Sequence, residues 1–125
     1  MSNVFDAAFT TLPLLTTSTI KATGATTLVA APGAGKSICV FMVGGNNQTN
    51  STGYAELALQ EGAGGTLRFR EYNNSLGTHF MDRNFLETPW ILDTNTAFLV
   101  VASVTAASSP GAEITVQYRI IDRTR

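Results

Sequence analysis

Short runs of β-forming residues, separated by breaks rich in Gly, Pro, Asn and Ser, restrict the fold of this chain more than any other feature. After the first dozen residues, no window of about ten residues combines helix formers with caps, so crossover helices have no place. The 125 residues suffice for one core but not for two. The runs predict eight strands, over residues 16–22, 26–30, 37–43, 54–61, 67–71, 78–82, 97–104 and 113–121.

Eight short antiparallel strands predict an all-β fold, a two-sheet jelly-roll sandwich formed by a single domain over residues 16–125. Residues 1–15 are expected to form an N-terminal arm or a short helix, because apolar residues recur there at helical spacing. Such a segment docks either on its own sandwich or on a neighbouring subunit. The apolar residues are Val4, Phe5, Ala8, Phe9 and Leu12.

The runs 54–61 and 67–71 are predicted to form a hairpin through the Gly-rich connection 62–65. Apolar residues alternate with polar ones in both runs, which specifies a register with one apolar face and one solvent-exposed face. The predicted pairs are Leu59 with Leu67, Leu57 with Phe69 and, on the outer face, Glu56 with Arg70.

Two strands, 38–43 and 98–101, are apolar on both faces, which a sandwich with one wet side does not accommodate. A second burial surface is therefore implied, either under the chain's own loop or N-terminal segment or at a subunit interface. Cys39 is read as a small buried hydrophobe, since nothing nearby lowers its pKa. The residues predicted to contact a subunit or a capsid are Phe5, Phe9, Leu12, Cys39, Phe41, Val43, Leu99 and Val101.

The segment 30–37 (Ala-Ala-Pro-Gly-Ala-Gly-Lys-Ser) matches a relaxed phosphate-loop pattern. That motif needs a helix to begin at Gly-Lys-Ser, so that the helix N-terminus meets the phosphates. The following residues 38–43 are apolar, largely β-branched and halted by Gly44-Gly45, so they predict a strand. We therefore predict a turn with Pro32 and Gly33 at its corners, and no nucleotide site.

Other catalytic constellations are not visible in the sequence. His79 is the only histidine and Cys39 the only cysteine, so no zinc pattern exists. The acidic residues are spread singly, and sequence does not pair two of them as acid and base. We expect a protein that is not an enzyme, with no catalytic, cofactor-binding or metal-binding residues and no cofactor.

Charged residues make up only 14% of the chain, against about 25% in a typical soluble domain. This composition favours a surface that is partly covered by protein partners. A net charge of −1 with dispersed basic residues argues against nucleic acid. No apolar run is long enough to span a membrane, and no basic flank precedes an apolar core at the N-terminus, so neither a span nor a signal peptide is expected.

A polar, uncharged loop over residues 44–53 follows the strand 37–43. Its amides suit glycan hydroxyls or a protein neighbour, and the alternative is a mobile, solvated loop. The predicted surface-binding residues are Asn46, Asn47, Gln48 and Asn50.

Three motifs occur in order along the chain: a Gly-Lys strand opening at 35–36, Pro89-Trp90 before the penultimate strand, and a closing strand with Thr115 and Tyr118. In this order they resemble the small jelly-roll proteins of tailed bacteriophage particles. The resemblance covers most of residues 26–121. The chain departs from that group in the polar loop 44–53 and in the long stretch 72–90.

The resemblance implies a structural virion protein without catalytic or metal residues. The expected function is capsid decoration (cementing): a homotrimer that binds major capsid proteins and stabilises the shell, made in the host cytoplasm and located on the capsid exterior. Neither nucleic acid nor a membrane is an expected partner. The alternative is a receptor-binding or glycan-binding jelly-roll domain of a tail or fibre.

Overall fold

The computed structural model describes residues 14–20, 24–47, 55–73, 79–104 and 112–123. These ranges contain β-strands and no helix. The strands are β1 (Leu14–Ile20), β2 (Gly24–Val29), β3 (Lys36–Asn47), β4 (Ala55–Glu61), β5 (Leu67–Asn73), β6 (His79–Asn84), β7 (Trp90–Ile91), β8 (Phe98–Val104) and β9 (Ala112–Asp122).

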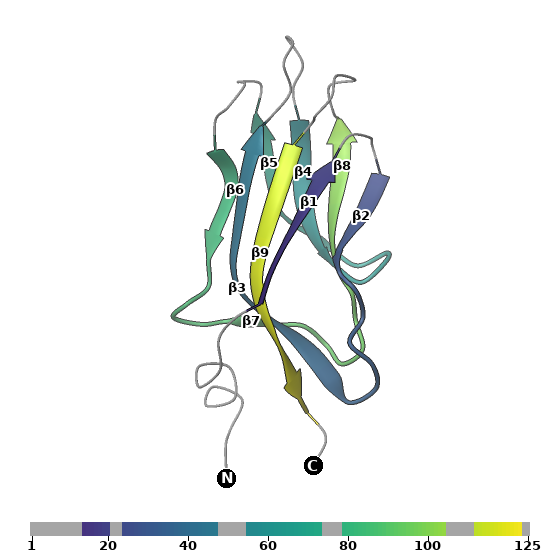
Figure 1. Ribbon diagram of the computed structural model, residues 1–125. Coiled ribbons are helices and arrows are strands. Elements are labelled where there is room, and N and C mark those ends of the chain that lie inside the picture. Colours follow the sequence, from purple (N-terminus) through teal and green to yellow (C-terminus); the bar gives the residue numbers. More distant parts are fainter. Residues whose placement is uncertain (1–13, 21–23, 48–54, 74–78, 105–111, 124–125) are drawn as a thin grey trace.

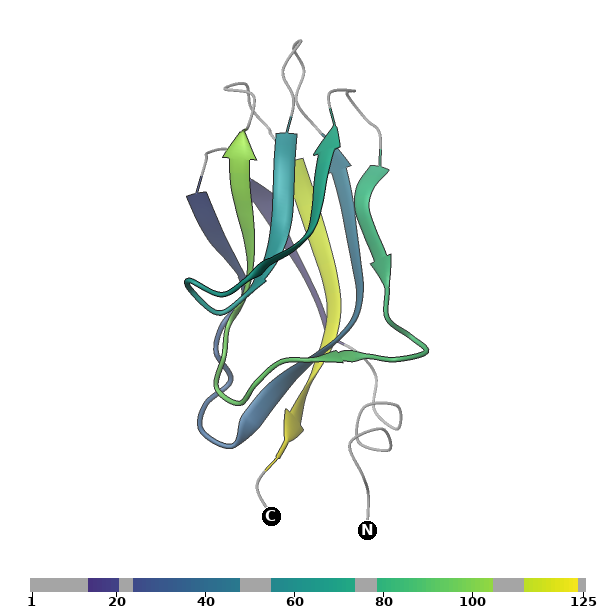
Figure 2. The ribbon, with the colours of Figure 1, turned by 180° about the vertical axis from the view of Figure 1, so that it is seen from behind.

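The strands form two antiparallel sheets that pack face to face (Figures 1 and 2). Sheet A has the order β1-β9-β3-β6, with the short β7 also paired to β3, and sheet B has the order β2-β8-β4-β5. If β7 is set aside and the other strands are renumbered, the orders become 1-8-3-6 and 2-7-4-5. This is the strand order of a jelly roll, so the predicted all-β, two-sheet fold is confirmed.

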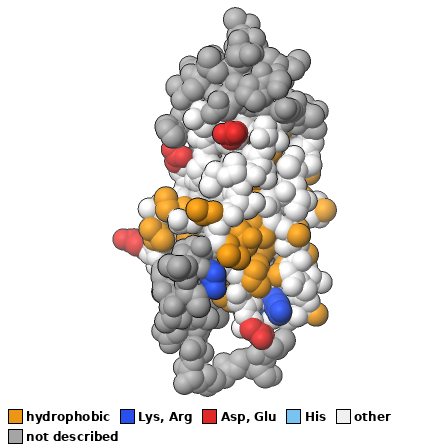
Figure 3. Space-filling view, viewed as in Figure 1, with side chains coloured by type: hydrophobic (Ala, Val, Ile, Leu, Met, Phe, Trp, Pro, Cys, Tyr) orange, Lys and Arg blue, Asp and Glu red, His pale blue; other side chains and the backbone are white. Residues whose placement is uncertain are grey.

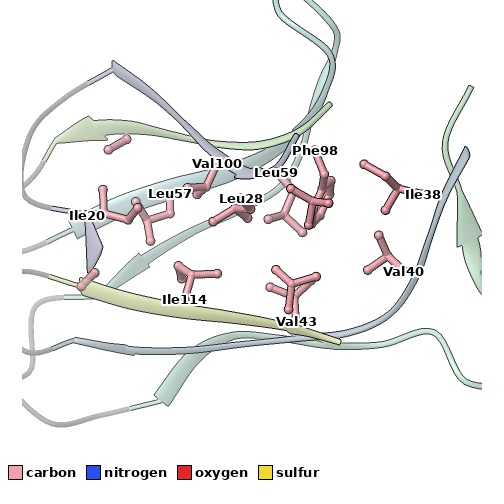
Figure 4. Packing of buried hydrophobic residues seen from close by; sticks show 14 of the residues in the cluster. Ile20, Leu28, Ile38, Val40, Val43, Leu57, Leu59, Phe98, Val100 and Ile114 are labelled. Atoms are coloured by element: carbon pink, nitrogen blue, oxygen red, sulfur yellow. The ribbon is translucent and has the colours of Figure 1, made fainter. Parts of the chain in front are cut away.

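The core fills the space between the two sheets (Figure 4). Val43 and Ile114 reach into it from sheet A, and Leu57, Leu59 and Val100 reach into it from sheet B. Each of these side chains is at most 1% exposed. Burying one such side chain contributes about 1.5–3 kcal/mol, so this layer is the main source of stability.

A β-bulge in β3 explains how one strand fills two hydrophobic clusters. The register against β9 shifts between Val40 and Met42, which leaves Phe41 as an extra residue. In a regular strand, two residues three positions apart lie on opposite faces. Because of the inserted residue, Val40 and Val43 both face the core.

The implied second burial surface exists. Cys39, Phe41 and Ile121 form a separate hydrophobic cluster, against which Ile91 of β7 packs. Cys39 and Phe41 are 0% and 1% exposed within a single chain. No second subunit is needed to bury them, so the chain's own residues provide the cover.

Strand β8 also carries apolar residues on both faces. Phe98 and Val100 lie in the core, whereas Leu99 and Val101 belong to the outer face of sheet B. There Leu99 is 7% exposed and Val101 is half-buried.

The predicted register of the β4–β5 hairpin is wrong. The structure pairs Leu57 with Glu71 and Leu59 with Arg68, because β5 carries an extra residue at this point. Phe69 adopts a φ of 56°, an uncommon conformation for a bulky residue, and its side chain is 37% exposed. The predicted alternation therefore fails on β5.

The predicted outer-face pair nevertheless forms, since Arg70 Nη1 lies 3.1 Å from Glu56 Oε1. Both side chains are partly exposed, so this pair contributes at most about 1 kcal/mol.

Several strand boundaries differ from those predicted, and one strand was not predicted at all. Strand β1 begins at Leu14, two residues earlier than expected, and β3 continues through both glycines to Asn47. Strand β7 was not predicted, because two residues carry no periodic signal. It belongs to a segment that follows the edge of β3, where Phe85 N–H donates to Phe41 O and Leu92 N–H donates to Ile38 O.

Candidate functional site

The phosphate-loop-like segment connects β2 in sheet B to β3 in sheet A. Gly33 and Gly35 have φ values of 107° and 75°, and Lys36 N–H donates to Gly33 O, which closes a turn. The side chain of Asn95 accepts the Gly33 N–H at 3.0 Å. Two amides that a phosphate loop presents to its ligand are thus already bound, and a strand follows instead of a helix. A turn forms in this segment, as predicted, but the corners closed by that hydrogen bond are Ala34 and Gly35 rather than Pro32 and Gly33.

Cys39 is fully buried among apolar side chains. Burial removes water from the thiolate and raises the pKa of Cys39 from 9.0 to about 11. The thiol is therefore protonated near neutral pH, which fits the prediction of a small buried hydrophobe.

We expect Cys39 to react with a thiol reagent in urea and to resist it in the native protein at neutral pH.

The pKa of Cys39 is higher in the folded state than in the unfolded state, so the folded protein binds more protons between about pH 9 and pH 11. Its stability is therefore expected to fall as the pH rises through that window. Urea titrations of wild type and Cys39→Ala at increasing pH test this. A wild-type curve that is as flat as the Cys39→Ala curve contradicts it.

Among the described residues, no three His, Cys, Asp or Glu side chains gather where they could hold a metal ion. Two of the acidic residues form ion pairs instead, Glu56 with Arg70 and Glu71 with Arg83. His79 lies in β6 opposite Asn46 of β3, at the edge of sheet A.

An aromatic cluster bridges the two sheets beside the edge strands β5 and β6. The Trp90 ring centroid lies 5.3 Å from that of Phe98, 5.7 Å from that of Phe85 and 5.8 Å from that of Phe69. Such tilted contacts add about 0.5–1.5 kcal/mol per pair beyond area burial. Trp90 Nε1 also donates to Glu61 Oε1 at 3.3 Å. The Pro89-Trp90 motif therefore has a packing role here.

A groove on the outer face of sheet A is the strongest candidate for a binding surface. One hollow of about 300 Å³ is lined by Gly44, Gly45, Asn46, Asp82, Glu113 and Thr115. A second hollow of about 180 Å³ is lined by Leu15, Met42, Gly44, Thr115 and Gln117. The two share Gly44 and Thr115, and we call them together the sheet A groove.

Strand register explains how these residues meet. Side chains that share a row across neighbouring strands lie on the same face of a sheet. One row across β1, β9 and β3 contains Leu15, Gln117 and Met42. The next row on that face contains Thr17, Thr115 and Gly44, and the third contains Thr19, Glu113 and Asn46. The groove therefore runs along the strands, from an apolar end to an acidic end.

The two ends differ in chemistry. At the apolar end, Leu15 is 67% exposed and Met42 is 38% exposed. The carboxylates of Asp82 and Glu113 line the other end. Figure 3 shows acidic side chains at the upper part of this face and a hydrophobic patch below them. An open surface that combines apolar and charged groups is typical of a protein contact.

The structure places the predicted site residues in different environments. Of the surface-binding residues, Asn46 lines the groove, the Asn47 side chain is not described, and Gln48 and Asn50 lie outside the described residues. Of the predicted contact residues, Phe5, Phe9 and Leu12 also lie outside. Those that lie inside the chain rather than on its surface are Cys39, Phe41, Val43 and Leu99, and Val101 is half-buried.

Sequence reasoning missed most of the groove, including Leu15, Met42, Asp82, Glu113 and Thr115. Gly44-Gly45 was the available signal, because glycine inside a strand often marks a place where another chain or ligand comes close. We interpreted these glycines as the end of the strand, whereas β3 continues past them.

The described part of the chain contains no helix that is long and apolar enough to cross a membrane. Comparison with known proteins finds no match: no family model fits the chain, and no curated protein and no solved structure is significantly similar to it.

Proposed function

We propose that this chain is a structural virion protein of a tailed bacteriophage, a capsid decoration protein that trimerises and binds major capsid proteins. The observation that carries the proposal is the sheet A groove, an open surface with exposed apolar side chains on a jelly-roll framework. The assignment to a tailed bacteriophage particle comes from the sequence resemblance to small jelly-roll proteins of such particles. The low charge of the chain, 14% of its residues, supports a surface that functions in contact with other proteins.

Decoration stabilises a shell by mass action, since a ligand that binds only the assembled form shifts the equilibrium toward it. A stable contact buries about 800 Å² on each partner. Leu15 of the edge strand β1 lines the groove and is 67% exposed. It is suited to such a contact, because apolar area is the main source of affinity in the centre of an interface.

The proposal predicts a trimeric mass in solution and binding to undecorated capsid shells. We expect Leu15→Asp to weaken shell binding by about tenfold or more, because it places a charge in the apolar part of the contact. Leu86→Asp is the matched control, since Leu86 is 45% exposed but does not line the groove. Light scattering gives the mass, and co-sedimentation with shells gives the binding.

A monomer that ignores shells contradicts the proposal. In that case the tail or fibre alternative gains support if a saccharide binds and its affinity falls in Asn47→Ala and Asn50→Ala. That alternative rests on the polar, uncharged loop over residues 44–53, whose amides suit glycan hydroxyls.

A further inference from the structure

The acidic end of the sheet A groove carries acceptor oxygens that lack partners among the described residues. Asp82 and Glu113 form no ion pair within the described ranges. Asn46 Oδ1 is buried there without a hydrogen-bond donor from the described part of the chain. A buried acceptor without a donor is unfavourable, so this end of the groove is suited to a ligand that brings N–H groups and positive charge.

Gly44 leaves the floor of the groove without a side chain. Its φ does not lie in the left-handed region, so backbone conformation does not require glycine at this position. A Cβ built there would lie 3.5 Å from Asp82 Oδ1, which is an ordinary contact. Glycine in a strand interior weakens the strand, because it has no side chain to pack and loses more backbone freedom on folding. Close approach of another backbone is a recurrent reason for such a glycine.

The dimensions of the groove indicate how a ligand would lie. The apolar row with Met42 and the acidic row with Asn46 are separated by four residues of β3, or about 13 Å at about 3.3 Å per residue. An extended peptide that lies parallel to the strands spans the same distance between its residues i and i+4.

We propose that the sheet A groove binds an extended segment of a protein partner, with an apolar side chain against Leu15 and Met42 and a Lys or Arg side chain at Asp82 and Glu113. This inference rests on the proposed function, in which the partner is the major capsid protein. Charge complementarity selects the basic residue, because the described residues of the lining include two carboxylates and no cation.

Other ligands fit the groove less well. A saccharide site commonly offers an aromatic ring for stacking, and none of the described residues that line the groove is aromatic. Two carboxylates fall short of the six or more oxygen ligands that calcium prefers.

The test uses the whole protein and a blocked pentapeptide, acetyl-Leu-Thr-Gly-Thr-Arg-amide, with the same peptide carrying Glu in place of Arg as control. In an NMR titration, the Arg peptide is expected to shift the amide signals of Gly44, Gly45 and Thr115. The effect is expected to fade at about 1 M salt, where the screening length falls to about 3 Å. The Glu peptide is expected to leave these signals unchanged.

Three variants locate the binding. Asp82→Asn with Glu113→Gln is expected to weaken binding of the Arg peptide by about tenfold, since the charges are removed while the shape is kept. Gly44→Val is expected to block the floor and abolish binding without changing any charge. Glu87→Gln is the matched control, because Glu87 is exposed and does not line the groove. Circular dichroism confirms that each variant folds.

The outcomes separate this inference from the proposed function. Suppose that the wild type binds shells. If the Arg and Glu peptides then behave alike, or if the Asp82→Asn, Glu113→Gln variant binds the Arg peptide as the wild type does, the groove inference is wrong and the proposed function stands. If the Arg peptide binds at the groove and the protein ignores shells, the groove inference stands and capsid decoration is wrong. Failure of both binding assays overturns both.

Discussion

Replacing Phe98 by alanine is expected to lower the free energy of unfolding by about 3–5 kcal/mol. Phe98 is 0% exposed and lies in the core between the sheets. Its ring packs edge-on against Trp90, with centroids 5.3 Å apart. The loss therefore combines the removal of buried apolar area, the cavity left behind and one aromatic contact.

Urea unfolding followed by circular dichroism measures this change, provided that the slope of the transition stays the same. Leu86→Ala is the control, since Leu86 is 45% exposed and we expect a change within about 0.5 kcal/mol. A loss below about 1 kcal/mol in Phe98→Ala would show that the two sheets do not pack around this ring.

Replacing Gly65 by alanine is the second substitution with a large expected effect, a loss of about 3 kcal/mol. The new Cβ would lie 2.1 Å from the carbonyl oxygen of Glu61, which is backbone and does not move aside easily. The turn is held in place from two sides: Gly65 N–H donates to Gly62 O, and Gln60 Nε2 donates to Gly65 O at 2.8 Å. Relieving the clash disrupts these bonds.

Gly64→Ala is the matched control for that substitution. Gly64 has a φ of 78° and open space around the Cβ position, so alanine there introduces backbone strain of about 1–2 kcal/mol but no collision. Thermal or urea unfolding compares the two variants. Equal losses would contradict the argument, because they would mean that the contact with Glu61 is relieved at little cost.

Most strands of the fold were predictable from the sequence, and the reason is local. Strand β9 illustrates this: Ile114 and Val116 are buried and Glu113 is exposed, so the alternation of residue types predicts which face is inside. The phosphate-loop-like turn was predictable for the same reason, since the residues after it favour a strand and exclude the helix that the motif needs.

The bulges were not predictable. A bulge inserts one residue into one strand, and its position depends on twist and on packing against the other sheet. At Phe41 the insertion brings Val40 and Val43 to the same face, and at Phe69 it shifts the hairpin away from the predicted register. In both places the apolar pattern alone fits more than one pairing.

Of the residues that line the candidate site, only Asn46 was predicted from the sequence. Asn46 was selected because it begins a polar stretch, whereas Asp82, Glu113 and Leu15 come from three other strands and are each unremarkable in the sequence. They meet because β1, β9, β3 and β6 are neighbours in sheet A. That order joins residues about 100 positions apart, such as Leu15 and Gln117, and such long-range pairing leaves no local signal.

The sequence by itself determined the class of fold, because strand propensity, turn residues and the lack of helical windows all act over a few neighbouring residues. It also determined that β3 and β8 need burial on both faces. Only the tertiary structure decided that the chain itself covers Cys39 and Phe41, and that acidic and apolar side chains share one groove. These outcomes depend on which strands become neighbours, and strand order follows from the packing of the whole sandwich rather than from any single segment.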